Sequence, residues 1–487
     1  MILNQKNRFP IMISCFFGLL AAWFSIGYFH LDEHYQILEF LSFKLGTGEL
    51  KNLPWEYKAQ IRPWIQPFFY FVTTKFFNAV GVDSPYILER VFRLISVILF
   101  QISIWRLTFY SIEKFKLEEK LSQFLIFSSS VFWAFPFLSA RISSEGVGGS
   151  LFFIGLIGVL KVIEQTEQGD KEINILSLFL NSLIIGLSVW VRFQLGAAVL
   201  GFLIWYILFS KRFLMKSFVF IAFGGIVAAA LGTLIDYWGY GEFVITPLKY
   251  FSRNIVEGEA ARHGVTPWWE YFYISQKKLH PGFGLFVVIC FIYQWVRNIK
   301  DVFSFSIFIF FLMHVGTAHK ELRFIYPMAM LIPLYMTLFL KQTGINKKFS
   351  SKLAKPAAMT LLAYFFVGSI ISSSRVQYQG VEAIKYLQDH NIEKAYYFSG
   401  IPLKNMTHDI EQSYYGKNIT QEIGVKSFDQ INENTSYFVS GRGGKQALLF
   451  QDQKCKEVFP RDNSLYFWLH YSRKFYKQDF YSIYLCN

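Results

Sequence analysis

Charged residues are scarce in this sequence. Asp, Glu, Lys and Arg make up 17% of its 487 residues, whereas a soluble globular chain carries about 25%. The four cysteines are too sparse for a disulfide scaffold, and the 33 glycines are too few for a collagen repeat. Because 53% of the residues are hydrophobic, an intrinsically disordered chain is excluded as well.

Aromatic residues take the place of the missing charge. The chain contains 55 Phe and 28 Tyr, and its formal net charge is +14. A basic chain can bind nucleic acid, but the apolar composition favours an integral, multi-pass membrane protein without a nucleic-acid partner. Since Lys and Arg gather in the cytoplasmic loops of membrane proteins, the positive charge predicts an orientation in the bilayer.

Eleven stretches are apolar and long enough to be membrane spans, which need about 20 residues each. The first follows Lys6 and Arg8 and has no small-residue cleavage site, so we expect an uncleaved span rather than a signal peptide. The eleven stretches are residues 10–29, 86–110, 121–139, 146–163, 173–191, 194–209, 216–235, 283–298, 302–318, 324–340 and 356–374.

Residues Trp64 to Gly81 are also apolar, but Pro67 interrupts them and Lys75 adds a charge. If this segment does not span, most basic residues of the short loops fall on one side, which is then cytoplasmic. The short loops of the other side hold only Arg141, Arg192, Lys320 and Arg323. We therefore predict that Trp64–Gly81 is a helix lying on the outer membrane surface.

This topology predicts two domains. Residues 1–374 form an all-α membrane domain with outer loops 30–85 and 236–282, and residues 375–487 form a small extracytoplasmic α/β domain. The tail has a helical pattern at Val381–Asp389 and strand-like runs at Ala395–Ser399, Ser436–Ser440 and Tyr481–Leu485. Cys455 and Cys486 lie in this tail, where an oxidising environment permits a disulfide, but the sequence leaves their pairing open.

The segment His30-Leu31-Asp32-Glu33-His34 follows the outer end of the first span. A carboxylate at this position can accept a proton from an attacking hydroxyl group and so act as a general base. The alternative is structural, because Asp32 can cap an amphipathic helix formed by Tyr35, Leu38, Leu41 and Leu45.

The segment His319-Lys320-Glu321-Leu322-Arg323-Phe324 forms the outer turn between two spans. Lys and Arg suit a phosphate group, one as a point charge and the other as a bidentate fork. The alternative is a hydrated turn whose charges stay at the interface. Isolated charges at other outer span ends serve as interface anchors or as ligands; they are Arg62, Arg141, Glu145 and Arg192.

All these charges are predicted to share one membrane face, where a lipid-linked anionic substrate has its phosphate. This arrangement suits a transferase that takes a sugar from a lipid phosphate. The sequence has no GxxxxGKS loop, GxGxxG fingerprint, paired CxxC or HExxH helix, so a nucleotide donor lacks an evident binding motif. The rival function is a lipid-linked sugar transporter or flippase, but such proteins place ionisable groups near the membrane midplane.

The two charged segments resemble the HPDE and HKExRF motifs of the glycosyltransferase family 22 mannosyltransferases, which are the Alg9, Alg12 and GPI-mannosyltransferase relatives with the GT-C membrane fold. Further ordered similarities cover about residues 10–340. They are Arg141-Ile-Ser-Ser-Glu145, Gly186-Leu-Ser-Val-Trp-Val-Arg192, Asp236-Tyr-Trp-Gly-Tyr-Gly241, Asn254, Gly258 and Gly264-Val-Thr-Pro-Trp268. The departures are Leu31 for Pro, Phe193-Gln194 for Pro-Thr, and Val265-Thr266 where the family has His before Pro-Trp.

The resemblance implies an inverting α-mannosyltransferase with a dolichyl- or polyprenyl-phosphate-mannose donor, a glycan or glycolipid acceptor, and no required nucleotide. We expect no cofactor and assign no metal-binding residue, and metal dependence stays open. A GT-C transferase of another polyprenyl-linked sugar stays open. Asp32 is then the expected base and Glu33 its assistant, while Lys320, Arg323, His319 and Arg192 bind the donor phosphate. The expected acceptor-binding residues are His30, His34, Arg62, Arg141, Glu145, Glu321 and Trp268. The composition favours a bacterial inner membrane; in a eukaryote the endoplasmic reticulum is expected. In either case the active site is extracytoplasmic.

Overall fold

The computed structural model describes residues 5–167, 173–210, 214–344, 351–375, 377–399, 405–407, 410–411, 413–415, 420–423, 436–442, 455–459 and 480–486. The chain divides into two compact units. The first contains Met1–Leu19, Ala59–Gln66 and Arg93–Ile370, and the second contains Leu20–Lys58, Pro67–Phe92 and Ile371–Asn487.

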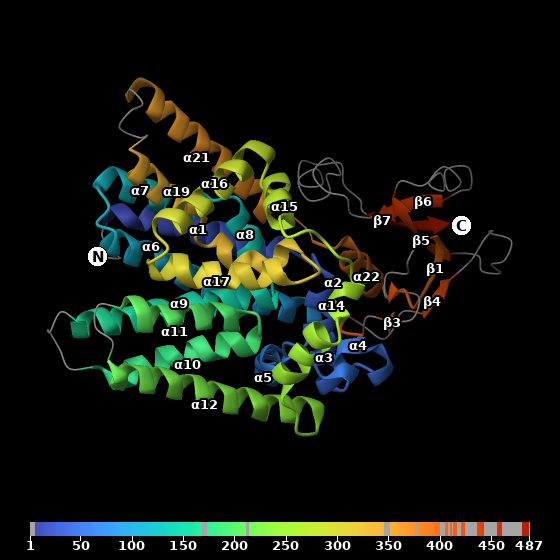
Figure 1. The fold of residues 1–487 in the computed structure, drawn as a ribbon. Coiled ribbons are helices and arrows are strands. Elements are labelled where there is room, and N and C mark those ends of the chain that lie inside the picture. Colours follow the sequence, from blue (N-terminus) through green and yellow to red (C-terminus); the bar gives the residue numbers. More distant parts are fainter. Residues whose placement is uncertain are drawn as a thin grey trace. The chain divides into compact units, whose positions relative to one another are not determined.

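The first unit is built from helices, coloured from blue to orange in Figure 1. Each of the eleven predicted stretches coincides with one or more of them. They are α1 (Gln5–Phe24), α6 (Pro85–Lys114), α7 (Glu119–Val131), α8 (Ala134–Ser139), α9 (Ser144–Glu167), α10 (Ile175–Val191), α11 (Leu195–Phe209), α12 (Met215–Tyr240), α16 (Pro281–Arg297), α17 (Val302–Gly316), α18 (Tyr326–Ala329), α19 (Ile332–Thr343) and α21 (Ser351–Ser373). Shorter helices connect α12 to α16, and they are α13 (Thr246–Phe251), η3 (Ser252–Val256), α14 (Glu259–Arg262) and α15 (Glu270–Lys278).

Two predicted spans are broken rather than continuous. Residues 121–139 divide into α7 and α8, and residues 324–340 divide into α18 and α19, which meet after the short helix η4 (Leu322–Ile325). Pro327 and Pro333 stand in the first turns of α18 and α19. Because proline cannot donate to the preceding turn of a helix, each marks a new start. The η4–α18 segment and α19 bend by 59°.

Within the described residues, four helices are long and apolar enough to cross a membrane, namely α1, α9, α12 and α21. The count rises to six if α16 with α17, bent by 112°, and η4–α18 with α19 are each one span, and α10 and α11 are shorter apolar helices. The predicted number of eleven spans therefore stays a prediction.

Helices α9, α10 and α12 lie side by side in the first unit (Figure 1). Small residues permit close approach: a Cβ atom on Gly158 of α9 would overlap Asn181 of α10, and one on Gly186 of α10 would lie 2.5 Å from Ala228 of α12. Gly148 of α9 lies against Ser188 and Arg192, and Gly158 lies against Asn181. The two helices therefore run antiparallel, and the start of α9 and the end of α10 lie at the same end of the unit. This places Glu145 beside Arg192.

The second unit begins with a helical segment that carries the predicted base. It consists of α2 (Leu31–Glu33), the π-helical turn η1 (His34–Leu38) and α3 (Glu39–Leu45). A helical segment is confirmed here, and Tyr35, Leu38 and Leu41 are buried as expected. It is not amphipathic, because its polar residues Gln36 and Glu39 are buried as well. The predicted cap was wrong, because the His30 side chain, not Asp32, accepts a hydrogen bond at the helix start, from the Asp32 backbone N–H.

Further helices follow in η2 (Leu50–Asn52), α4 (Trp55–Ala59) and α5 (Ile65–Ala79). Helix α5 confirms a helix within Trp64–Gly81. Its residues Phe69, Val72 and Phe76 are exposed at helical spacing. Such an apolar stripe is typical of a helix lying on a membrane, although its membrane location stays a prediction.

The C-terminal part of the second unit is a mixed sheet with the strand order β4-β1-β5-β7-β6. Its strands are β1 (Lys394–Ser399), β4 (Thr420–Ile423), β5 (Ser436–Arg442), β6 (Cys455–Phe459) and β7 (Phe480–Cys486), and β2 (Asn405–Thr407) pairs with β3 (Ile410–Glu411). Helix α22 (Gln379–Asp389) packs against β7. The helical pattern and the three strand-like runs predicted for the tail are thus confirmed.

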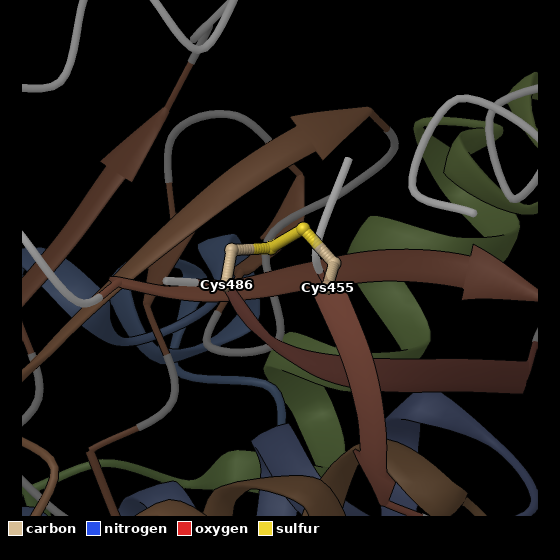
Figure 2. Close-up of a disulfide and its surroundings, with 2 residues drawn as sticks. All are labelled: Cys455 and Cys486. Atoms are coloured by element: carbon tan, nitrogen blue, oxygen red, sulfur yellow. A yellow bond between two sulfur atoms is a disulfide. The ribbon is translucent and has the colours of Figure 1, made fainter. Parts of the chain in front are cut away.

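Cys455 and Cys486 form a disulfide, shown in Figure 2. They are directly opposite each other on the antiparallel strands β6 and β7, and their Cα atoms are 4.1 Å apart. This register answers the question that the sequence left open. Cys15 and Cys290 are free thiols.

Candidate active site

Glu145 is the centre of a charged cluster in the first unit. It stands in the first turn of α9, and its side chain is only 3% exposed. The Arg192 guanidinium lies 3.0 Å from Glu145 Oε1, and that of Arg323 lies 3.7 Å from the same oxygen. One buried carboxylate therefore contacts two guanidinium groups.

Glu321 adds a second, more exposed carboxylate. Its Oε1 lies 3.0 Å from His319 Nε2, and its Oε2 accepts a hydrogen bond of 2.7 Å from Arg323 Nε. Arg323 thus contacts both carboxylates. Of the expected phosphate ligands, the structure brings Arg192, Arg323 and His319 into one cluster with Glu145 and Glu321.

Lys320 lies beside this cluster and is 6% exposed. Its ammonium group donates to the carbonyl oxygens of Thr317, at 2.7 Å, and Thr266, at 3.1 Å. These bonds join the end of α17 to the loop before α15. Burial lowers the pKa of Lys320, and the Glu270 carboxylate opposes that shift. An ammonium group has three donors, and the described residues accept two of them, so the third N–H can bind a ligand.

The Phe324 ring is the common neighbour of the cations. The guanidinium carbons of Arg323 and Arg192 lie 5.0 and 5.5 Å from its centroid, which is within cation–π range. The rings of His319 and His314 lie 6.2 and 6.4 Å away. Both guanidinium groups therefore make cation–π contacts with the same Phe324 ring.

His314 and Tyr271 are site residues that we did not predict. Both are buried, and their ring centroids are 6.4 Å apart. The signal for His314 was present in the sequence, since an ionisable residue inside a membrane span is by default a functional candidate. Nothing in the sequence singles out Tyr271 among 28 tyrosines.

The remaining predicted residues of the first unit are Arg62, Arg141 and Trp268. The charges of Arg141, Glu145 and Arg323 all act on the Tyr326 hydroxyl, so Arg141 lies near the cluster. Arg62 stacks over Tyr250, with 5.9 Å between its guanidinium carbon and the ring centroid. Arg141 stacks over Phe137 at 5.1 Å. Trp268 is largely exposed in the loop before α15.

The predicted base is in the second unit. The Asp32 side chain is 23% exposed and lies 3.5 Å from His30 Nδ1. Glu33 is buried, and the Phe29 backbone N–H lies 3.4 Å from its carboxylate. Asp32 is therefore the more accessible carboxylate of the pair.

His34 does not point to solvent but joins a buried network around Glu39. His34 Nε2 lies 2.7 Å from Glu39 Oε1, which also accepts from the backbone N–H groups of Ser413, at 2.7 Å, and Tyr414, at 3.0 Å. The His34 ring stacks on Tyr415 with 5.4 Å between the centroids. Sequence analysis missed Glu39, although a charge between Leu38 and Phe40 on the apolar face was a usable signal.

Throughout the part of the chain that the structure describes, no group of three or more His, Cys, Asp or Glu side chains is arranged to hold a metal ion. The polar groups of the candidate site described above are carboxylates, imidazoles and cations. These groups can accept a proton and stabilise an anionic leaving group.

The sequence matches the model of a known protein family. The model of the Alg9-like mannosyltransferase family matches residues 10–401. GPI mannosyltransferase 4 of Candida glabrata is 25% identical over 381 residues, which cover 73% of this chain and 70% of the relative. GPI mannosyltransferase 3 of Drosophila melanogaster is 23% identical over 362 residues, covering 72% of this chain and only 59% of that protein.

Among solved structures, the fold is similar to ArnT from Cupriavidus metallidurans bound to undecaprenyl phosphate. The TM-score is 0.50 at 8% identity, and the match covers 99% of this chain and 98% of the other. At this identity the likeness concerns the fold alone, which is a mostly helical membrane fold of the GT-C type, as predicted.

Proposed function

Because the chain belongs to the Alg9-like mannosyltransferase family, we propose that it transfers mannose from a polyprenyl- or dolichyl-phosphate-linked donor to a glycan or glycolipid acceptor. The predicted family and the predicted class of membrane glycosyltransferase are confirmed by that membership. The observation that carries the proposal is the cationic cluster of Arg192 and Arg323 with Lys320 beside it. The undecaprenyl phosphate bound to the structurally similar ArnT supports a polyprenyl donor.

In this proposal Asp32 takes the proton from the acceptor hydroxyl group. The acceptor oxygen forms a bond to the anomeric carbon of mannose while the bond from that carbon to the phosphate oxygen breaks. The electron pair leaves with the polyprenyl phosphate, and attack from the opposite face inverts the configuration to give an α-linked product. The partial exposure of Asp32 supports this role, and buried Glu33 assists it.

The leaving phosphate carries the developing negative charge, so positioned cations lower the barrier. Arg323 supplies a planar fork, and Lys320 supplies its remaining N–H donor. Because Glu321 already contacts Arg323, the phosphate replaces this carboxylate as a partner of the guanidinium. His319 and Arg192 support the same anion. We assign acceptor binding to His30, Arg62, Arg141, Glu321 and Trp268. The buried residues His34 and Glu145, which were expected in the same role, pair with Glu39 and Arg192 instead.

We assign the reaction to the extracytoplasmic side of a membrane crossed about eleven times, a bacterial inner membrane or the endoplasmic reticulum in a eukaryote. The Cys455–Cys486 disulfide supports an oxidising location for the tail. Cysteine labelling from each side of sealed membranes tests the topology, and positions 32 and 320 are expected to react from the same side.

The central experiment incubates the purified chain in liposomes with labelled polyprenyl-phosphate-mannose and acceptor glycolipids. We expect a new glycosidic bond, which a transporter does not form. Asp32→Asn should abolish transfer while the protein still accumulates, and Lys320→Ala should reduce use of the donor more than use of the acceptor. Normal turnover by Asp32→Asn would remove Asp32 from the base role, and transfer of a different sugar would correct the donor.

A further inference from the structure

A buried imidazole with one unused nitrogen lies next to the cationic cluster. His314 is 2% exposed, and its Nδ1 lies 2.8 Å from the Phe310 carbonyl oxygen, one turn earlier in α17. A carbonyl oxygen only accepts hydrogen bonds, so Nδ1 carries the proton. In the neutral ring, Nε2 then carries a lone pair and is an acceptor.

This acceptor is buried and has no hydrogen-bond partner among the residues that the structure describes. Buried polar atoms in folded proteins are nearly always hydrogen-bonded, and an exception at a functional site calls for a partner such as a ligand or water. A lone pair repels an anionic phosphate oxygen but accepts a hydrogen bond from a hydroxyl group. The chemistry of His314 Nε2 therefore suits a sugar hydroxyl.

The surroundings of His314 belong to the same cluster. Its ring lies 4.3 Å from Phe310 and 6.4 Å from Phe324, and the charged groups that act on it are Arg192 and Glu145. Phe324 in turn supports the guanidinium group of Arg323. The imidazole is thus next to the cations that would hold the donor phosphate, which is where the attached sugar has to be.

Tyr271 provides a second buried polar group near the imidazole, with 6.4 Å between the two ring centroids. Burial raises the pKa of Tyr271, so its hydroxyl stays protonated and can donate. The backbone of Glu321 and the guanidinium of Arg192 also act on this hydroxyl. A neutral acceptor and a neutral donor are therefore carried by neighbouring rings, and the charge of Arg192 acts on both groups.

We propose that His314 Nε2 and the Tyr271 hydroxyl bind hydroxyl groups of the donor's sugar and select that sugar. The inference rests on the proposed function, since it names the sugar-binding residues of the same site. The phosphate binds to the cations, and the neutral pair binds the uncharged ring attached to it.

The test pairs protein variants with donor variants. His314→Phe removes the ring nitrogens, and Tyr271→Phe removes one oxygen. Each is assayed as the full chain with polyprenyl-phosphate-mannose and with donors lacking the 2-, 3-, 4- or 6-hydroxyl of mannose. We expect wild type to lose roughly 10-fold or more in kcat/KM with one of these deoxy donors. The variant that lacks the partner of that hydroxyl should show the same loss of kcat/KM with polyprenyl-phosphate-mannose. Its kcat/KM should fall no further when the deoxy donor replaces the mannose donor.

Tyr273→Phe, on an exposed residue of the same helix α15, is the matched control and should treat all donors as wild type does. If a variant has a kcat/KM that is lower than that of wild type by the same factor for every donor, its residue has a packing role and the inference is overturned. Equal use of all deoxy donors by wild type would overturn it too, while leaving the proposed function intact. If wild type transfers no sugar, the proposed function fails, and the same pairing is read from equilibrium binding of labelled donors. Tyr271→Phe carries the test if His314→Phe does not fold.

Discussion

Gly232 of α12 faces the indole ring of Trp190, and this contact supports a sharp prediction. A methyl group at position 232 would lie closer than 3.0 Å to Cδ1 and Nε1 of Trp190. The indole cannot easily move away, because it is buried in a core cluster with Ile65 and Val147. Its Nε1 also donates to Asp236, at 3.3 Å.

The cost of Gly232→Ala follows from these contacts. Overpacking a core costs about 1–3 kcal/mol, and losing the hydrogen bond to the Asp236 carboxylate costs about 1.5–3 kcal/mol more. Replacing glycine by alanine in a helix stabilises the folded state by about 0.8–1 kcal/mol, which offsets part of this loss. We expect a net loss of roughly 2–5 kcal/mol. The same carboxylate accepts a 2.7 Å bond from the Trp64 backbone N–H, so the effect should extend to residues 59–66.

Gly225→Ala is the matched control, since it lies in the same helix and the added methyl group meets nothing within 4 Å. Thermal unfolding of the purified proteins in detergent measures both variants. The melting temperature should fall by several degrees for Gly232→Ala and stay level or rise for Gly225→Ala. Equal melting temperatures for the two variants would refute the packing argument.

Three further predictions concern charge and cross-links. Replacing Cys455 and Cys486 by Ser should destabilise the sheet by about 3–4 kcal/mol, because the cross-link spans 31 residues. Limited proteolysis should cut the variant faster than wild type, and wild type treated with dithiothreitol should be cut as fast as the variant. Glu145→Gln should cost about 3–5 kcal/mol in thermal unfolding by removing the carboxylate that pairs with the buried Arg192 guanidinium, while Arg323 keeps its pair with Glu321; the exposed Glu119→Gln should change stability by less than about 0.5 kcal/mol. Glu39→Gln should weaken two charge-assisted bonds from backbone amides, worth about 1.5–3 kcal/mol each, and speed limited proteolysis of the tail; unchanged proteolysis would contradict this.

Sequence patterns predicted the local structure well, since apolar runs and periodicity are local properties. They placed helices on all eleven apolar stretches and strands on the three tail runs. They failed at details that depend on single side chains. Asp is a residue type that often caps helix N-termini, yet His30 rather than Asp32 is the N-cap residue of α2. The His30 ring nitrogen accepts a 3.2 Å hydrogen bond from the Asp32 backbone N–H.

The site was predicted in composition but not in pairing. A charge pattern indicates that Glu145, Arg192 and Arg323 face one side of the membrane, but it cannot show that both cations share one carboxylate. Contacts between residues far apart in the chain are equally hidden. Nothing near Glu39 in the sequence indicates that its partners are the backbone amides of residues 413 and 414.

The distance along the chain between Glu39 and Ser413, 374 residues, has a consequence for biogenesis. A ribosome adds about 5–20 residues per second, so about 20–75 s pass between the synthesis of the carboxylate and that of its amide donors. During that interval Glu39 has its local partners His34 and Ser42 but lacks the two backbone amides of the tail. We expect chaperones at the insertion machinery to engage this stretch, and pauses in translation ahead of residue 413 to lower the yield of folded protein.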